Sequence, residues 1–191
     1  MTTRYWAYYI SVCVLVLVGL ILNYRSPAPA ENLLPSDSQN VESVGQSQVI
    51  MPTSQHIPEG QNTTYNTIPP TSGDHWASWA KCGFYEEGLP DELIVHNLEH
   101  SMVVISYNLT TEAEVDELRM AVNSIALYRK WGLSRFYDKI PSGTVAMTAW
   151  GMLDTVDQID RDRIERFFND YASNEGLERI PCEVDPSQIQ V

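Results

Sequence analysis

Four histidines and one glutamate are the residues of this chain whose types and spacing could do chemistry. The run His96-Asn97-Leu98-Glu99-His100 places two imidazoles four positions apart, with a carboxylate just before the second. In a helix, side chains at this spacing lie about 6 Å apart on one face, so both imidazoles could hold one ion. In a strand they would lie about 13 Å apart and could not. Joint metal binding therefore depends on the conformation of this segment.

The residues before His96 predict a short helix. Pro90 is followed by Asp91 and Glu92, and acidic side chains are favourable in the first turn of a helix. A run rich in β-forming residues follows Ser101 and would end that helix. We therefore expect a helix from about Asp91 to His100.

A metal site would need at least one further ligand from elsewhere in the chain. His75 is the best third candidate, because the turn-forming segment Ile68-Pro69-Pro70-Thr71-Ser72-Gly73 fixes the backbone that leads to it. His56 and Glu99 are the reserve ligands. The alternative is that these histidines only make structural hydrogen bonds in a polar cleft.

The ligand set allows two kinds of metal chemistry. Three imidazoles suit a zinc or copper ion, and Met102 or Met147 would favour copper if its sulfur faced the site. The same run also matches H-x-x-E-H, the inverted zinc-peptidase pattern, in which Glu99 would be the general base. Because such peptidases carry the motif in a much larger fold, we favour a non-enzymatic metal-binding or metal-sensing role. A metal-dependent hydrolase is an alternative.

The elements around the histidines predict a single compact α+β domain with a small β-sheet and two main helices. Two short apolar runs indicate strands, and two amphipathic stretches indicate the helices. The strands are expected at Met102–Tyr107 and Thr144–Trp150, and the helices at a capping box of Thr111 with Glu114 and at Asp157 or Asp160.

The first 25 residues predict a transmembrane anchor. Residues 5–24 contain no charged side chain, and about 20 apolar residues are enough to cross a bilayer. Arg4 and the amino terminus precede the span, which favours an orientation with the C-terminal domain outside the cytoplasm, in a periplasmic, extracellular or lumenal space. The alternative is a secretory signal, for which Ala28-Pro29-Ala30 resembles a cleavage site. Residues 26–50, rich in Ser, Gln, Asn, Pro and Glu, are expected to form a flexible linker before a globular domain at 51–185.

The charge of the chain argues against nucleic acid as a partner. The formal net charge is -13, and all 25 acidic residues follow residue 25, whereas Arg4 and Arg25 precede the domain. The part of the chain after the predicted anchor is therefore even more acidic than the whole, and it would repel phosphate groups and attract cations.

Two cysteines, Cys82 and Cys182, follow the predicted anchor and are a natural disulfide in an oxidising compartment. Such a bridge would close a loop of about 100 residues and stabilise the fold by about 4–5 kcal/mol in the chain-entropy description. The alternative is that Cys82 is a metal thiolate.

Several longer motifs resemble the family called domain of unknown function 3105 (DUF3105). The matching residues are Tyr65, Asn66, Pro69 to Gly73, His75, Trp76, Val95 to His100, Val103 to Ile105 and Thr148 to Gly151. The resemblance covers about residues 55–170, and Ser101 stands where the family pattern has glycine. It implies a membrane-anchored or secreted protein with its site at the histidines, and it implies no particular reaction.

A third hypothesis for function needs no metal at all. The chain would then be a structural or accessory single-span subunit of a membrane complex, with a partner that the sequence does not identify. In that case the histidines would be packing residues.

Overall fold

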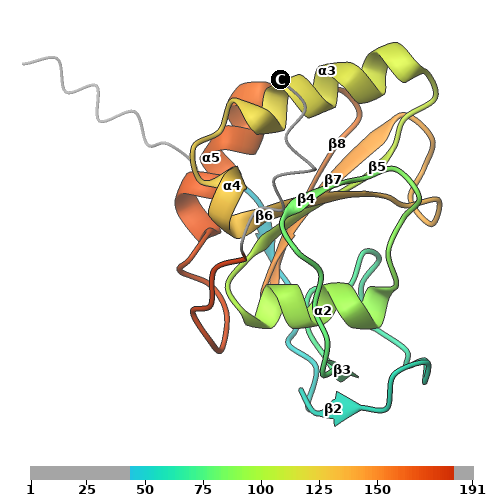
Figure 1. The fold of residues 1–191 in the computed structure, drawn as a ribbon, viewed down its shortest axis with the longest axis vertical. Coiled ribbons are helices and arrows are strands. Elements are labelled where there is room, and N and C mark those ends of the chain that lie inside the picture. Colours follow the sequence, from blue (N-terminus) through green and yellow to red (C-terminus); the bar gives the residue numbers. More distant parts are fainter. Residues whose placement is uncertain (1–43, 183–191) are drawn as a thin grey trace, which may run out of the picture. The chain divides into compact units, whose positions relative to one another are not determined.

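A six-stranded mixed sheet forms the centre of the fold (Figure 1). The computed structural model describes residues 44–182, so the predicted anchor and most of the predicted linker lie outside the described residues. The strand order is β1-β8-β7-β5-β6-β4, and central β5 is antiparallel to β7 and parallel to β6. The strands are β1 (Gln46–Ser47), β4 (Gly83–Tyr85), β5 (Val103–Asn108), β6 (Gly132–Phe136), β7 (Thr144–Ala149) and β8 (Met152–Val156).

Helices cover both faces of this sheet. Helices α3 (Glu112–Asn123), α4 (Tyr128–Trp131) and α5 (Arg161–Tyr171) lie on one face, and α2 (Asp91–Glu99) lies on the other (Figure 1). A separate pair of two-residue strands, β2 (His56–Ile57) and β3 (His75–Trp76), packs against the outer side of α2. Helix α2 is therefore enclosed between two sheets.

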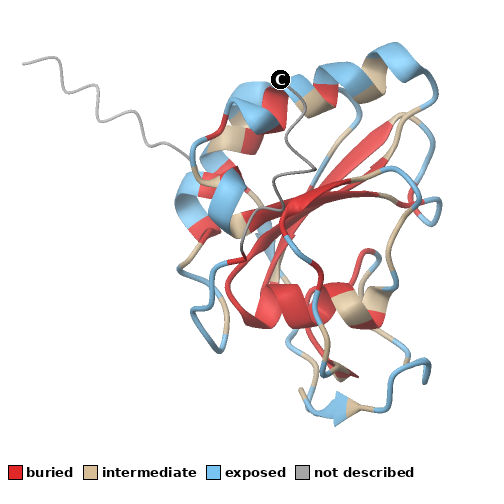
Figure 2. Ribbon diagram, in the orientation of Figure 1, coloured by how far each residue is buried: buried red, intermediate tan, exposed pale blue. Residues whose placement is uncertain are grey.

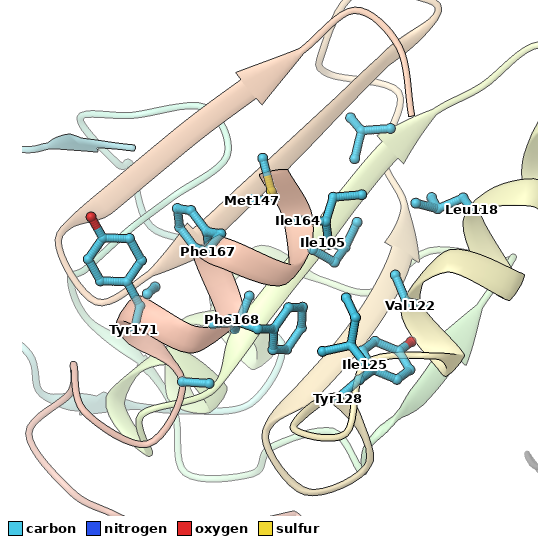
Figure 3. Packing of buried hydrophobic residues seen from close by; sticks show 14 of the residues in the cluster. Ile105, Leu118, Val122, Ile125, Tyr128, Met147, Ile164, Phe167, Phe168 and Tyr171 are labelled. Carbon is cyan, nitrogen blue, oxygen red and sulfur yellow. The ribbon is translucent and has the colours of Figure 1, made fainter. Parts of the chain in front are cut away.

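The face under α3 and α5 holds the main apolar core (Figure 3). Alternate side chains of β5, including Ile105, point to this face and meet Leu118 of α3 and Phe168 of α5. All three of these side chains are fully buried. Burying a side chain of this size contributes about 1.5–3 kcal/mol, so this core supplies much of the stability of the domain.

Helix α2 is buried along almost its whole length (Figure 2). Ile94, Val95 and Leu98 pack against the sheet residues Val104 and Leu133 in a second, smaller apolar cluster. Its other side carries polar residues that are also buried, because β3 and its neighbouring loops cover them. This enclosure gives the fold an interior position for polar side chains.

The structure confirms the α+β class and most of the expected elements. The expected strands correspond to β5 and β7, and the capping box of Thr111 and Glu114 begins α3. Asp160 caps α5 by accepting a hydrogen bond from the backbone N–H of Arg163.

The two main helices correspond to α3 and α5, but the sheet is larger than expected and the short helix α4 was not predicted. Residues 44–182 contain a six-stranded sheet, a two-stranded sheet and four helices. No helix among these residues is long and apolar enough to span a membrane. The first described residues already belong to the fold, because Val44 is buried in the main core and β1 pairs with β8.

Candidate metal centre

Helix α2 carries three of the candidate site residues on one side. It runs from Asp91 to Glu99, with His100 as its C-cap residue, as the sequence predicted. The helical spacing places the Nε2 atoms of His96 and His100 3.0 Å apart. The strand alternative, which would have separated these rings, is therefore excluded.

The loop before β3 delivers His75 to the same place. Thr71 and Ser72 of this loop are completely buried, and so is His75. The Nδ1 atom of His75 lies 2.8 Å from the carbonyl oxygen of Gly73, and its Nε2 lies 3.0 Å from Oε2 of Glu99. The loop thus fixes both the position and the rotation of the ring.

Strand pairing brings the fourth histidine to the group. Strands β2 and β3 are parallel, and His56 is directly opposite His75 in their register. The ring centroid of His56 lies 5.1 Å from that of His75 and 5.0 Å from that of His96. His56 is solvent-exposed, so it forms the open side of the group.

Four of these side chains converge closely enough to be ligands of one ion. One nitrogen each of His56, His75 and His96 and one carboxylate oxygen of Glu99 all lie within 4.8 Å of one another. Ligands bound to one ion at about 2.0–2.2 Å would be about 3–4 Å apart, so small side-chain movements would complete the coordination. The structure thus gathers His75 and His96 with both reserve residues.

Two backbone carbonyls fix which nitrogens could bind a metal. A carbonyl oxygen only accepts hydrogen bonds, so Nδ1–H of His75 donates to Gly73 and Nδ1–H of His96 donates to Trp76, at 2.8 and 2.6 Å. In the neutral rings the lone pair is then on Nε2, which in His75 faces Glu99. Histidines that ligate metals commonly donate their other ring N–H to a carbonyl in this way.

His100 lies beside this group but is not one of the four mutually close ligands. Its Nε2 is 3.0 Å from Nε2 of His96 and 3.5 Å from a carboxylate oxygen of Glu178, whereas its buried Nδ1 has no hydrogen-bond partner. Burial, together with the neighbouring His96, lowers the pKa of His100 to about 4. Burial is also the main cause that lowers the pKa of His96. Both rings are therefore neutral near pH 7, as metal ligands must be.

The methionines that would have favoured copper lie elsewhere. The sulfur of Met102 accepts a hydrogen bond from the Asn97 side chain and packs beside the cysteines. Met147 belongs to the main apolar core on the opposite face of the sheet. The donor group therefore consists of imidazole and carboxylate.

Two residues that lie next to the site, Trp79 and Glu178, were not predicted from the sequence to be part of it. Trp79 is about half-exposed, and its ring centroid lies 4.8 Å from that of His100 and 5.1 Å from that of His96. Glu178 approaches His100 from a segment far along the chain. No local spacing connects either residue with the histidines, so only the fold reveals them.

Cys82 and Cys182 form the predicted disulfide. Both residues are buried, and their Cα atoms are 5.4 Å apart. Cys82 is thereby not a thiolate ligand. The bond indicates an oxidising compartment outside the cytoplasm.

Comparison with known proteins identifies the family of this chain. A family model described as "Protein of unknown function (DUF3105)" matches residues 56–183. The chain belongs to the DUF3105 family. No curated protein and no solved structure matches the chain. The matched range begins at His56 and includes all five side chains of the site.

The departure of this chain from the DUF3105 pattern at Ser101 has a structural meaning. Ser101 has a φ of 66°, in the left-handed region that favours glycine. The residue ends α2 with a turn, and the amide of Met102 donates to the carbonyl of Asn97. The turn thus forms with serine, although glycine would adopt it with less strain.

Proposed function

We propose that this DUF3105 protein binds one divalent transition-metal ion through His75, His96 and Glu99, with His56 as an exposed fourth ligand. The observation that carries the proposal is the convergence of one nitrogen each of His56, His75 and His96 and one oxygen of Glu99 within 4.8 Å of one another. The Nδ1–H groups of His75 and His96 are already bound to backbone carbonyls, so Nε2 is the free nitrogen of each neutral ring. Nε2 of His75 and Oε2 of Glu99 lie 3.0 Å apart, a separation that two ligands of one ion would also have.

The donor chemistry favours zinc, with copper(II) as the second choice. Three imidazoles and one carboxylate are ligands that zinc accepts at about 2.0–2.2 Å. Copper(I) prefers soft sulfur ligands, and Met102 and Met147 are engaged elsewhere. The acidic surface of the chain supports cation capture, since its formal net charge is -13.

We propose binding or sensing of the metal without turnover. Glu99 contacts His75 and is one of the four converging donors, so its position is that of a metal ligand. In the H-x-x-E-H pattern, by contrast, the glutamate is a general base and does not bind the metal. His75, His96 and Glu99 are buried, whereas His56 is open to solvent. Such a site would let metal enter or leave through displacement of one ligand. We further propose that the predicted anchor tethers this domain outside the cytoplasm, where a membrane partner remains a prediction.

The test is metal retention by the full-length protein, purified in mild detergent. We expect about one zinc per chain after gel filtration, and loss of that zinc in His96→Ala and in Glu99→Gln. Glu92→Gln is the matched control, because Glu92 is also buried on α2 but accepts a hydrogen bond from the Thr63 backbone and is outside the donor group. His56→Ala should weaken zinc binding less than His96→Ala.

Three outcomes would contradict this function. Wild-type protein that neither retains nor takes up zinc or copper would overturn it, and the histidines would then be packing residues. Variants that lose thermal stability equally with and without metal would point to the structural-subunit hypothesis. A Glu99→Gln variant that keeps its zinc would show that Glu99 is not a ligand.

A further inference from the structure

The C-terminal end of α2 is capped by a distant segment, residues 173–182, which we call the C-terminal strap. The last carbonyls of a helix have no partner within the helix. Here the carbonyls of Glu99, His100 and Ser101 accept hydrogen bonds from strap amides, those of Glu178, Ile180 and Ser173 respectively. The strap therefore holds the backbone of the turn that bears Glu99 and His100.

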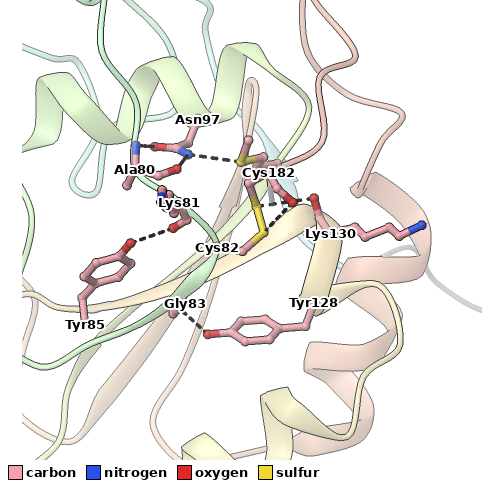
Figure 4. Close-up of a disulfide and its surroundings, with 10 residues drawn as sticks. Ala80, Lys81, Cys82, Gly83, Tyr85, Asn97, Tyr128, Lys130 and Cys182 are labelled. Atoms are coloured by element: carbon pink, nitrogen blue, oxygen red, sulfur yellow. Dashed lines mark hydrogen bonds between the residues drawn. A yellow bond between two sulfur atoms is a disulfide. The ribbon is translucent and has the colours of Figure 1, made fainter. Parts of the chain in front are cut away.

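The Cys82–Cys182 disulfide joins the strap to a second segment that also holds α2 (Figure 4). Just before Cys82, the backbone N–H and C=O of Ala80 both bond to the side chain of Asn97, at 3.0 and 2.8 Å. Asn97 also donates to the sulfur of Met102, which packs on the two cysteines. The disulfide thus links the two segments that clamp the end of the helix between them.

The strap is otherwise held by a few further contacts, among them hydrogen bonds from the Ser101 hydroxyl to the Glu178 carbonyl and from the Cys182 amide to the Lys130 carbonyl. Its residues from Leu177 to Pro181 are all exposed, and only Cys182 at its end is buried. Segments with few buried contacts and exposed hydrogen bonds open at low free-energy cost. The disulfide adds a covalent restraint to these hydrogen bonds and so helps to keep the strap on the turn, with the carboxylate of Glu178 within 3.5 Å of His100.

We propose that the Cys82–Cys182 disulfide controls the metal affinity of the site through the C-terminal strap, so that the oxidised protein holds the ion tightly and the reduced protein releases it. This inference rests on the proposed metal-binding function. With the strap in place, Glu99 and its neighbours are held in the geometry that the donor group needs. Without it, the last turn of α2 loses its cap, and Glu99 loses its fixed position.

The redox step is ordinary thiol–disulfide exchange with a dithiol. One thiolate of the dithiol attacks a sulfur of the cystine and breaks the Cys82–Cys182 bond, and its second thiolate then resolves the mixed disulfide. Two electrons and two protons pass to the protein, giving two cysteine thiols, and the dithiol becomes a disulfide. Both sulfurs are buried, so opening of the strap must precede this attack.

The first test compares zinc affinity of the wild-type chain with that of the double variant Cys82→Ser, Cys182→Ser. These variants imitate the reduced state without a reductant that could itself bind zinc. We expect Kd to rise by about 10- to 100-fold, the usual effect of removing support around metal ligands. Competition with a chromophoric chelator on full-length protein measures this change.

A second variant keeps the disulfide and displaces the strap. A Cβ atom at Gly176 would lie 2.6 Å from the Ser101 backbone nitrogen and 2.7 Å from the Glu99 carbonyl oxygen, so Gly176→Ala must push the strap outward. We expect Kd for zinc to rise in this variant as well. Gly143→Ala is the matched control, because Gly143 also has a positive φ but open space around it, and its zinc affinity should equal that of wild type.

The outcomes separate this inference from the proposed function. If wild type binds zinc and both the double cysteine variant and Gly176→Ala bind it with unchanged Kd, the inference is overturned while the metal site stands. A lower melting temperature with unchanged Kd would likewise overturn it, because the disulfide would then be structural only. If wild type binds no metal, both proposals fail.

Discussion

The two faces of the six-stranded sheet bury different kinds of side chain. The face under α3 and α5, here called the apolar face, buries aromatic and aliphatic side chains such as Phe167, Phe168 and Ile105 (Figure 3). The face under α2, here called the polar face, buries the charged residue Arg135, which pairs with the partly buried Asp91 close to a smaller apolar cluster. The two faces thus differ in the chemistry of the side chains that they bury.

Burying charged groups on the polar face is unfavourable, and the packing of the apolar face offsets this cost. The guanidinium of Arg135 is completely buried and donates to Ser106, to the Leu89 carbonyl and to Asp91. Desolvation of such a pair commonly offsets its attraction, so an apolar replacement would often be as stable. What this network does achieve is to fix the start of α2, while the strap fixes its end. We infer that the apolar face supplies most of the stability of the fold, whereas the polar face holds α2 and its site residues in position.

The largest expected effect on stability comes from the apolar face. Phe168→Ala removes a fully buried ring that packs against Tyr128, and it should lower the free energy of unfolding by about 3–5 kcal/mol because it leaves a cavity. Urea unfolding measures this loss. Zinc affinity of the folded fraction should stay unchanged. A large change in affinity would show that the two faces are not independent.

A smaller loss is expected from the polar face. Arg135→Met leaves Asp91 with Lys139 and Tyr137 as its remaining side-chain partners within residues 44–182. The change should cost about 3 kcal/mol, the lower end for breaking a buried ion pair. Unlike Phe168→Ala, it should also weaken zinc binding, because the start of α2 loses its attachment. Adding Asp91→Asn to this variant removes the unpaired charge and should recover part of the stability. Failure to recover any would mean that packing of the Arg135 stem, and not its charge, matters.

The smallest expected effect is a pH dependence that belongs to the polar face. Burial alone would raise the pKa of Asp91, but Arg135 and Lys139 outweigh it and hold the pKa below its ordinary value of 3.8. A carboxyl whose pKa is depressed by folding stabilises the fold above its unfolded pKa, and this contribution is lost as pH falls through the folded value. Unfolding free energy of metal-free protein should therefore drop below about pH 3.8, and this part of the drop should be absent in Asp91→Asn. Identical profiles for the two proteins would contradict the assignment.

The sequence predicted well those features that local patterns encode. Helix α2 followed from Pro90 and the acidic first turn, and α3 from its capping box. Strand β6 was missed because Ser134 and Arg135 interrupt its apolar pattern, although the fold buries both. Strand β8 was missed because it carries Asp154 at a buried position, where the carboxylate pairs with Arg163.

Within the site, the sequence could name the donors but not their arrangement. The meeting of His56 with His75 depends on a parallel register between two short strands, which no local pattern specifies. Glu178 reaches His100 because the strap crosses the end of α2, where backbone hydrogen bonds and the disulfide hold it. Non-local contacts of this kind decide which side chains share a centre.

The most direct test of the metal centre is X-ray absorption at the zinc edge of the zinc-loaded, full-length protein. We expect four nitrogen or oxygen ligands at about 2.0–2.2 Å, with the outer-shell scattering of three imidazoles, and loss of one imidazole contribution in His56→Ala. A spectrum with fewer than two imidazoles in the wild-type protein, or a protein that holds no zinc to measure, would contradict this expectation.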